Sequence, residues 1–171
     1  MAIPKRTKIV SLKFSRDALL YDIKNYAFVE GDIMLTEEEH AKHQVFDIAE
    51  DGNIDRVPRV LDLAHSECVE FMYPYTKIEC EDEELRCNEL SETGTYFIGL
   101  LVPDDFSQST VNFISKYVHE YMVSRVLSDW FSITKPSSKN NWEEKMNQAQ
   151  EKIQVQLNAR CKRVRRTQTP F

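Results

Sequence analysis

Residues 107–134, SQSTVNFISKYVHEYMVSRVLSDWFSIT, form the longest periodic segment of the chain. Apolar and aromatic residues recur in it at the three- and four-residue spacing of an α-helix. They spread beyond one narrow stripe, so we expect a helix that is covered on most sides and lies at the centre of the fold. The helix is expected to run from about Ser107 to Thr134, and Lys135-Pro136 ends it.

Two charged residues, Arg125 and Asp129, interrupt the apolar stretch of this helix. Their i, i+4 spacing allows them to pair with each other. A charge on a largely buried helix usually has a partner, and such a pair often orders an interface. The alternative is a charged edge of the helix that faces solvent.

Three segments have the composition of short strands. Residues 95–102, TYFIGLLV, are continuously apolar and predict a buried strand that stops at Pro103. Residues 75–79, YTKIE, are its candidate hairpin partner. Residues 7–14, TKIVSLKF, predict a further strand near the start of the chain.

Four further helices are expected from apolar periodicity and from their start and stop signals. They run from Ser15 to Gly31, from Thr36 to Asp51, from Asp55 to Pro74 and from Ser138 to about Arg163. Ser15 and Asp55 are predicted N-caps, and Gly31 is a C-cap candidate. Thr36 and Glu39 have the spacing of a capping box.

These elements predict a mainly α domain with a small β element and about five helices around a central long helix. The 171 residues suffice for one buried core. We expect an N-terminal arm or strand at 1–14, a single helical domain at 15–159 and a basic C-terminal arm at 160–171. The domain contains an acidic loop at 79–94.

Opposite charges are concentrated in two separate segments of this chain. Its formal net charge is −6, yet residues 160–171, RCKRVRRTQTPF, hold five basic residues and no acid. Without them, 17 basic residues face 28 acidic ones, a balance of −11. Residues 79–93, ECEDEELRCNELSET, hold seven acids against one Arg. An acidic body repels polyphosphate, so we do not expect the whole surface to bind nucleic acid.

Several function classes lack their sequence signature. The four glycines are too far apart for a phosphate-cradling loop, which argues against the common nucleotide enzymes. No run approaches the roughly 18 to 20 apolar residues of a membrane span, and we expect no signal peptide. The four cysteines have neither disulfide nor zinc spacing, which indicates reduced thiols in a cytosolic product.

Histidines offer two weak candidates for a site. His40 and His43 lie at i, i+3, but only His65 and Glu67 are near enough in sequence to add metal ligands, so an exposed polar face is favoured. His65 and Cys68 share a helix face, yet Cys68 falls on the apolar stripe and is expected to be a buried structural thiol. We therefore assign no catalytic residue, metal ligand or cofactor.

The order of elements in the middle of the chain is distinctive. A helix ends in SECVEFMYPYT, a variable loop and a strand lead to LLVPDDFSQST, and a long helix carries KYVHEYMVSRVLSDWFS. Over roughly residues 55–134, this order is similar to the head-to-tail connector (adaptor) proteins of tailed bacteriophages. Those are small, mainly helical proteins that form a ring beneath the portal.

The chain as a whole also resembles proteins encoded among the structural genes of phages and prophages of gut bacteria. The matching stretches are YDIKNYAFVEGDI, HQVFDIAEDGN, VHEYMVSRVLSDWFSITKP and the closing VRRTQTPF. The chain departs from small connectors in its extra N-terminal 50 residues and its long last helix with a basic tail. A neck ring, a tail-completion protein and another tail component therefore remain as alternative positions.

The resemblance implies a non-enzymatic virion component, made in the cytoplasm of a bacterial host. Its implied partners are its own copies in a ring and portal or tail proteins, with weak DNA contact in a ring lumen and no membrane or small-molecule ligand. Subunits of a ring need complementary front and back surfaces, which separated charges provide. The expected partner-binding residues are Arg160, Lys162, Arg163, Arg165, Arg166, Phe171, Glu81, Asp82, Glu83 and Glu84.

Two alternatives remain from the residues alone. The basic tail is also typical of a nucleic-acid-binding regulator, whose affinity would fall steeply with salt. An enzyme without a compact motif is the third alternative, and the missing glycine loops and ligand sets argue against it.

Overall fold

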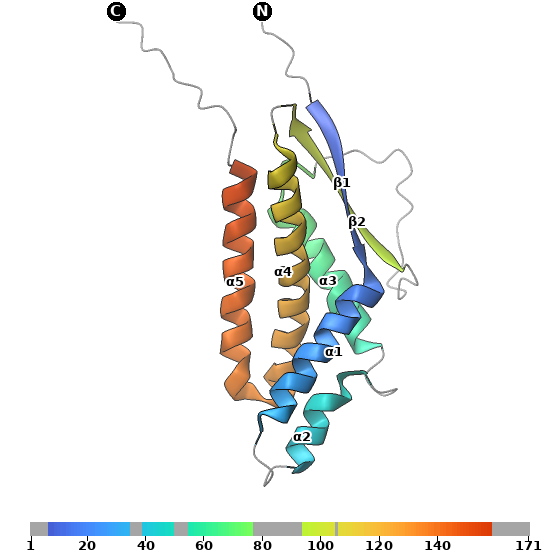
Figure 1. Ribbon diagram of the computed structural model, residues 1–171, viewed down its shortest axis with the longest axis vertical. Helices are drawn as coiled ribbons and strands as arrows, with labels where there is room; N and C mark the ends of the chain where they lie inside the picture. The colour runs from blue at the N-terminus through green and yellow to red at the C-terminus, as the bar shows by residue number, and fades with distance from the viewer. Residues whose placement is uncertain (1–6, 35–38, 50–54, 77–93, 105, 159–171) are drawn as a thin grey trace, which may run out of the picture.

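The computed structural model describes residues 7–34, 39–49, 55–76, 94–104 and 106–158. Its elements are, in order, β1 (Thr7–Ser15), α1 (Arg16–Asp32), α2 (Glu39–Phe46), the 3-10 helix η2 (Asp47–Ala49), α3 (Arg56–Phe71), β2 (Thr95–Pro103), α4 (Gln108–Thr134) and α5 (Pro136–Asn158). The prediction of a mainly α domain with a small β element is confirmed (Figure 1). Among these helices, none is long and apolar enough to cross a membrane.

Helix α4 is the central element, as its periodicity predicted. It contacts α1, α2, α3, α5 and β1. Four consecutive residues, Tyr121 to Ser124, are buried, and burial of a whole turn means that neighbours cover the helix on every side. Its start is capped by Ser107, whose Oγ accepts a hydrogen bond from Thr110 N at 3.1 Å. The helix ends at Thr134 and leads into the antiparallel α5 (Figure 1).

The sheet pairs β1, the first described element, with β2, the last element before α4. β1 and β2 pair antiparallel, with Thr7 opposite Pro103 and Ser15 opposite Thr95. Alternate side chains face the helices and are buried, namely Leu12, Phe14, Tyr96, Ile98, Leu100 and Val102. The two predicted strands are therefore confirmed, and they form one layer against the helices.

The predicted hairpin partner of β2, residues 75–79, lies mostly outside the described residues, and the strand that pairs with β2 is β1. Of residues 75–79, the structure describes Tyr75 and Thr76, and these form no strand. Tyr75 contributes a single carbonyl, which accepts a hydrogen bond from Leu101 N at 2.7 Å. β1 takes the ladder because it presents two large apolar side chains, Leu12 and Phe14, to the same inner face as β2.

Gly31 does not end a helix in a left-handed turn. α1 continues through it to Asp32, and no described residue has a positive φ. A Cβ at this position would lie 2.6 Å from Cε1 of Phe46, whose ring also packs against Phe28 at 5.3 Å between centroids. The glycine is needed because the aromatic ring of α2 approaches the backbone of α1 closely.

The turn between α4 and α5 is a single residue, Lys135. α5 begins at Pro136, two residues before the predicted start at Ser138, because proline fits the first helical position, where an N–H has no helical partner. Lys135 Nζ and Ser138 Oγ both donate to Oε2 of Glu30, at 2.9 and 3.1 Å. The end of α1 thus holds this turn in place.

Two other predicted N-caps stand at the expected positions without a capping bond. Ser15 and Asp55 precede α1 and α3, but their side chains accept no hydrogen bond from the first turn. The capping box of Thr36 and the Glu39 side chain lie outside the described residues, as does the predicted helix end near Arg163.

Candidate functional site

All ten predicted partner-binding residues lie outside the described part of the chain. They are Arg160, Lys162, Arg163, Arg165, Arg166, Phe171, Glu81, Asp82, Glu83 and Glu84. The structure instead defines the points from which the two charged segments extend. The acidic segment follows Thr76, at the end of the chain that leaves α3, and the basic segment follows Asn158, the last residue of α5.

These two points lie beside each other. The hydroxyl of Tyr75 donates to the carbonyl of Leu157 at 3.2 Å, and the carbonyl of Tyr75 accepts from Leu101 N at 2.7 Å. Thr76 is held in turn, because its Oγ1 donates to the carbonyl of Val69 at 2.8 Å. Tyr75 therefore joins the ends of α3, β2 and α5.

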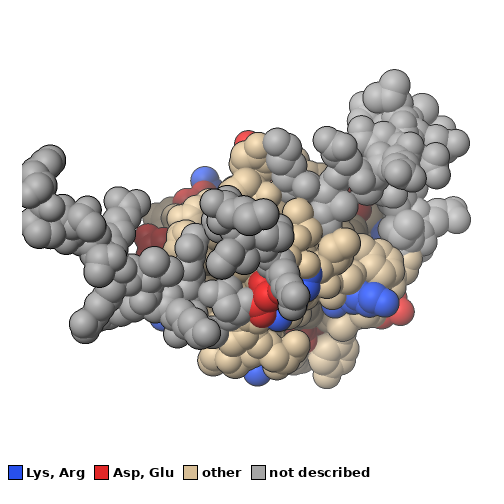
Figure 2. All heavy atoms as spheres, turned by 90° about the horizontal axis from the view of Figure 1, so that it is seen from above, with Lys and Arg blue, Asp and Glu red and all other residues tan. Residues whose placement is uncertain are grey.

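Thr76 and Asn158 consequently lie at the same end of the domain, where β1 also begins (Figure 1). The acidic segment rejoins the described chain at Gly94, whose carbonyl accepts a hydrogen bond from Arg16 N at the other end of the sheet. Figure 2 looks onto this end, and the described surface in that view consists mostly of uncharged residues. The seven acids of residues 79–93 and the five basic residues of residues 160–171 lie outside the described part of the chain.

The charged residues of α4 pair with α3 and not with each other. Arg125 Nε lies 3.2 Å from Oε2 of Glu67, and Asp129 Oδ2 lies 2.8 Å from Nη2 of Arg56. The i, i+4 prediction was therefore wrong, because acceptors and donors on α3 lie closer to these groups. The expectation that such charges order an interface is met by a contact between two helices of the same chain.

Glu67 is the centre of this polar contact. Its Oε2 also accepts a hydrogen bond from the hydroxyl of Tyr121 at 2.8 Å. Burial and then this bond to the carboxylate raise the pKa of Tyr121, so its hydroxyl stays protonated and remains a donor. The arrangement satisfies the buried polar groups and leaves Arg125 engaged within the domain.

The candidate nucleophile does not form a catalytic pair. Cys68 is fully buried among apolar side chains, and this burial raises the pKa of its thiol and suppresses the thiolate. His65 instead donates from Nε2 to the carbonyl of Phe97 at 2.8 Å and packs on the ring of Tyr96. The expected structural role of Cys68 agrees with its position in the core.

A metal site finds no support among the described residues, where no group of three His, Cys, Asp or Glu side chains has suitable geometry. The side chain of His40 lies outside the described part, and His43 is exposed on α2. The metal site considered for His40 and His43 therefore has no third ligand among the described residues.

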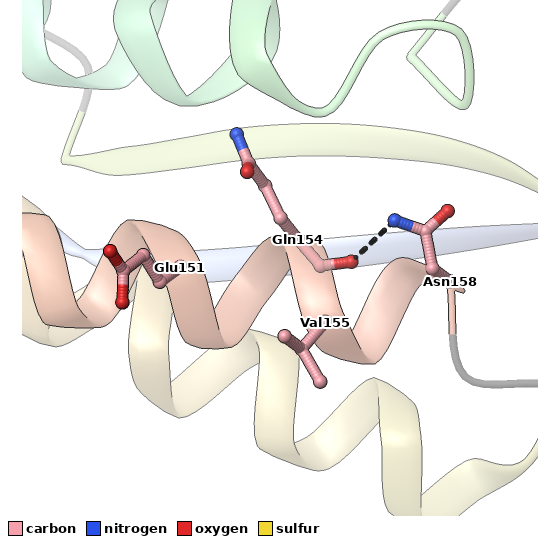
Figure 3. Close-up of a pocket in the computed structure, with 4 residues that line it drawn as sticks. All are labelled: Glu151, Gln154, Val155 and Asn158. Atoms are coloured by element: carbon pink, nitrogen blue, oxygen red, sulfur yellow. Dashed lines mark hydrogen bonds between the residues drawn. The ribbon is translucent and has the colours of Figure 1, made fainter.

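A pocket on the outer side of α5 is lined by four exposed residues at successive helical turns, Glu151, Gln154, Val155 and Asn158 (Figure 3). Asn158 Nδ2 donates to the carbonyl of Gln154 at 2.9 Å. These four residues offer amide groups, one carboxylate and one apolar side chain.

The outer face of the sheet carries exposed apolar side chains that the sequence analysis did not single out. Ile9 and Leu101 are direct cross-strand neighbours, and their exposed fractions are 70% and 38%. Phe97 is 55% exposed on the same face, beneath the ammonium group of Lys13 at 5.5 Å from the ring centroid. The strand composition of these segments could have predicted such a face, because every second residue of a strand points away from the core.

No protein-family model, curated protein or solved structure matches this chain. The geometry of the described residues therefore has to support any function by itself.

Proposed function

We propose that this protein is a structural component of a tailed-bacteriophage virion, a ring-forming head-to-tail connector, neck or tail-completion protein. The observation that carries the proposal is the hydrogen bond between Tyr75 and Leu157. It holds the start of the acidic segment, after Thr76, next to the start of the basic segment, after Asn158.

This arrangement supports a ring in a specific way. Identical subunits that contact each other front to back form a closed ring when neighbouring copies are related by a rotation without a shift along the axis. They form an open helical filament when such a shift is present. The two complementary segments start at the same level along the long axis of the domain (Figure 1). The basic segment of one copy can therefore meet the acidic segment of the next with little rise along the ring axis.

The described core supports a structural role as well. Its charged groups are used within the domain, as in the pairs of Glu67 with Arg125 and of Arg56 with Asp129. A rigid domain in which two oppositely charged segments start at neighbouring points is suited to multivalent contact with neighbours. Phe171, at the tip of the basic segment, is an aromatic residue of the kind that anchors interfaces.

The test is assembly with candidate partners. Light scattering after size exclusion, followed by negative-stain imaging with portal and tail proteins from the same gene neighbourhood, should give rings or ring-bearing complexes. Isolated ring subunits are often monomeric, so the partner experiment decides. A protein that stays monomeric and binds neither portal nor tail proteins contradicts the proposal.

A second candidate, a nucleic-acid-binding regulator, is favoured by the five basic residues of the tail. It requires tight binding whose log–log slope against salt reaches about −4 to −5 and which is lost without residues 160–171. Weak binding with a shallow slope agrees with DNA contact in a ring lumen and does not support a regulator.

A further inference from the structure

The two strands show which backbone groups of the sheet are free. In an antiparallel pair, the N–H and C=O of one residue point to the same side of the strand. Leu101 N donates to Tyr75 and the carbonyl of Phe97 accepts from His65, so Leu101 and Phe97 both point away from β1. Their cross-strand partners on β1 must then point away from β2.

Those partners are Ile9, opposite Leu101, and Lys13, opposite Phe97. Ser11, midway between them, points to the same side. No hydrogen bond between described residues uses the outward backbone groups of Ile9, Ser11 or Lys13. β1 therefore has an open edge within the described part of the chain.

The open edge is symmetric about Ser11. When a second copy of β1 is placed antiparallel with Ser11 opposite its counterpart, Ile9 of each copy faces Lys13 of the other. All three residues point outward, so they meet as hydrogen-bonded pairs. A slip by one residue sets outward-pointing groups against inward-pointing ones, so only slips of two residues compete with this register.

The charges agree with this register. No two lysines lie opposite each other, because Lys13 faces Ile9 and Lys8 faces Phe14. Like charges directly opposite would destabilise the pair, so their absence favours the two-fold arrangement. Thr7–Ser15 contains no proline or bulge, and its two lysines, which can discourage edge pairing, lie opposite uncharged residues in this register.

The exposed apolar side chains gain contacts in the same arrangement. Across the outer face of the four strands, Leu101 and Ile9 of one copy lie in a row with Lys13 and Phe97 of the other. The two-fold axis generates a second, equivalent row. Ile9 is 70% exposed in the single chain, and it would then lie between Leu101 and the aliphatic stem of a lysine. A two-stranded sheet is also the smallest and least stable form, and pairing doubles its strands.

We propose that two copies of this protein associate through β1, forming a continuous four-stranded antiparallel sheet around a two-fold axis at Ser11. This contact goes beyond the ring proposed above, because it is isologous and uses the sheet edge. The attachment points at Thr76 and Asn158 take no part in it. Each contact can therefore fail without the other.

Sedimentation velocity over a range of concentrations tests the contact. The mass should rise from 20.1 kDa toward twice that value. Ile9→Lys places a lysine opposite Lys13 at both symmetric positions and should weaken the dimer roughly tenfold. Ile9→Glu is the matched control, since the same exposed position then faces Lys13 with the opposite charge and the dimer should persist.

Further variants distinguish association through β1 from association through other surfaces. Ile9→Lys combined with Lys13→Glu should restore the dimer, and deletion of residues 164–171 should leave it intact. Circular dichroism of each variant checks that the domain is folded. The proposal is overturned if the wild-type protein keeps a mass of 20.1 kDa at every concentration. It is also overturned if the lysine and glutamate variants weaken association equally, or if assemblies larger than two depend on Ile9.

Discussion

Glu67 on α3 and Arg125 on α4 bind each other across the interface of two helices, with Oε2 and Nε 3.2 Å apart. Their side chains are 29% and 25% exposed, so water screens the pair only in part. The same carboxylate accepts the hydroxyl of Tyr121. One acidic side chain thus satisfies two polar groups of the central helix.

Replacing Glu67 by alanine should lower the free energy of unfolding by about 2 kcal/mol, because Arg125 and Tyr121 both lose their acceptor. Urea unfolding followed by circular dichroism measures this. The control is Arg56→Ala, whose loss should stay within about 1 kcal/mol because the side chain is 42% exposed. Equal losses in the two variants would contradict a special role of Glu67.

Acid should weaken the clamp at the turn between α4 and α5. Burial opposes the charged form of Glu30, but the hydrogen bond and charge of Lys135, with the hydroxyl of Ser138, outweigh it and lower the pKa of Glu30 below its ordinary 4.5. A lowered folded-state pKa stabilises the fold above the unfolded value, and this contribution is lost as the pH falls through the folded pKa.

Glu30→Gln should therefore remove part of the acid sensitivity. Its melting temperature should lie below that of the wild type at neutral pH, and the two should converge as the pH falls below about 4.5. Differential scanning calorimetry across pH measures both. Glu151→Gln, an exposed change on α5, is the control and should run parallel to the wild type.

Alanine at Gly31 should destabilise the domain by about 1 kcal/mol or more, because the added methyl group meets the ring of Phe46 at 2.6 Å. In an open helix the same change is stabilising by up to about 1 kcal/mol. The sign of the effect therefore reports the packing. Thermal unfolding should show that Gly31→Ala becomes neutral or stabilising when Phe46 is also changed to leucine.

Removing the hydroxyl of Tyr75 should loosen the end of α5. Tyr75→Phe loses the bond to the carbonyl of Leu157 and should cost about 1 kcal/mol. Hydrogen exchange should then accelerate in the last turn of α5, while α4 keeps its protection. Uniform acceleration in both helices would show that the residue supports the whole fold and has no local role.

Deleting residues 164–171 should leave the melting temperature unchanged and impair assembly with portal or tail partners. Reversing the charges of Arg163, Arg165 and Arg166 should have the same effect, and reversing Glu81 to Glu84 in the same chain should restore assembly. Normal assembly of the deletion variant, or unfolding of the truncated domain, contradicts the proposed role of the tail.

The helices were predictable because their signals are local. The periodicity of residues 107–134 and the composition of residues 7–14 and 95–102 located α4, β1 and β2 within a few residues. The pairing of β1 with β2 was not predictable in this way. Strands distant in sequence carry no local record of which partner they meet, and a nearby segment such as 75–79 looks equally suitable.

Side-chain partners were harder still to predict. Arg125 and Asp129 satisfy the spacing rule of a single helix, yet the structure brings Glu67 and Arg56 closer from α3. Gly31 shows the same limit, because its role depends on a ring that α2 brings from outside its own helix. The open edge of β1 could not be inferred from the sequence, because it follows from the hydrogen bonds that Leu101 and Phe97 make on the side of β2 away from β1.

The order of the two strands has a consequence for the newly made chain. β1 leaves the ribosome before β2, and the ladder between them can form only after α1, α2 and α3 have all been synthesised. Until then, Leu12 and Phe14 have no strand to shield them, and the loop that must close is long. β1 is therefore synthesised well before its partner strand can pair with it, so slow or interrupted translation should expose it to chaperones and proteases.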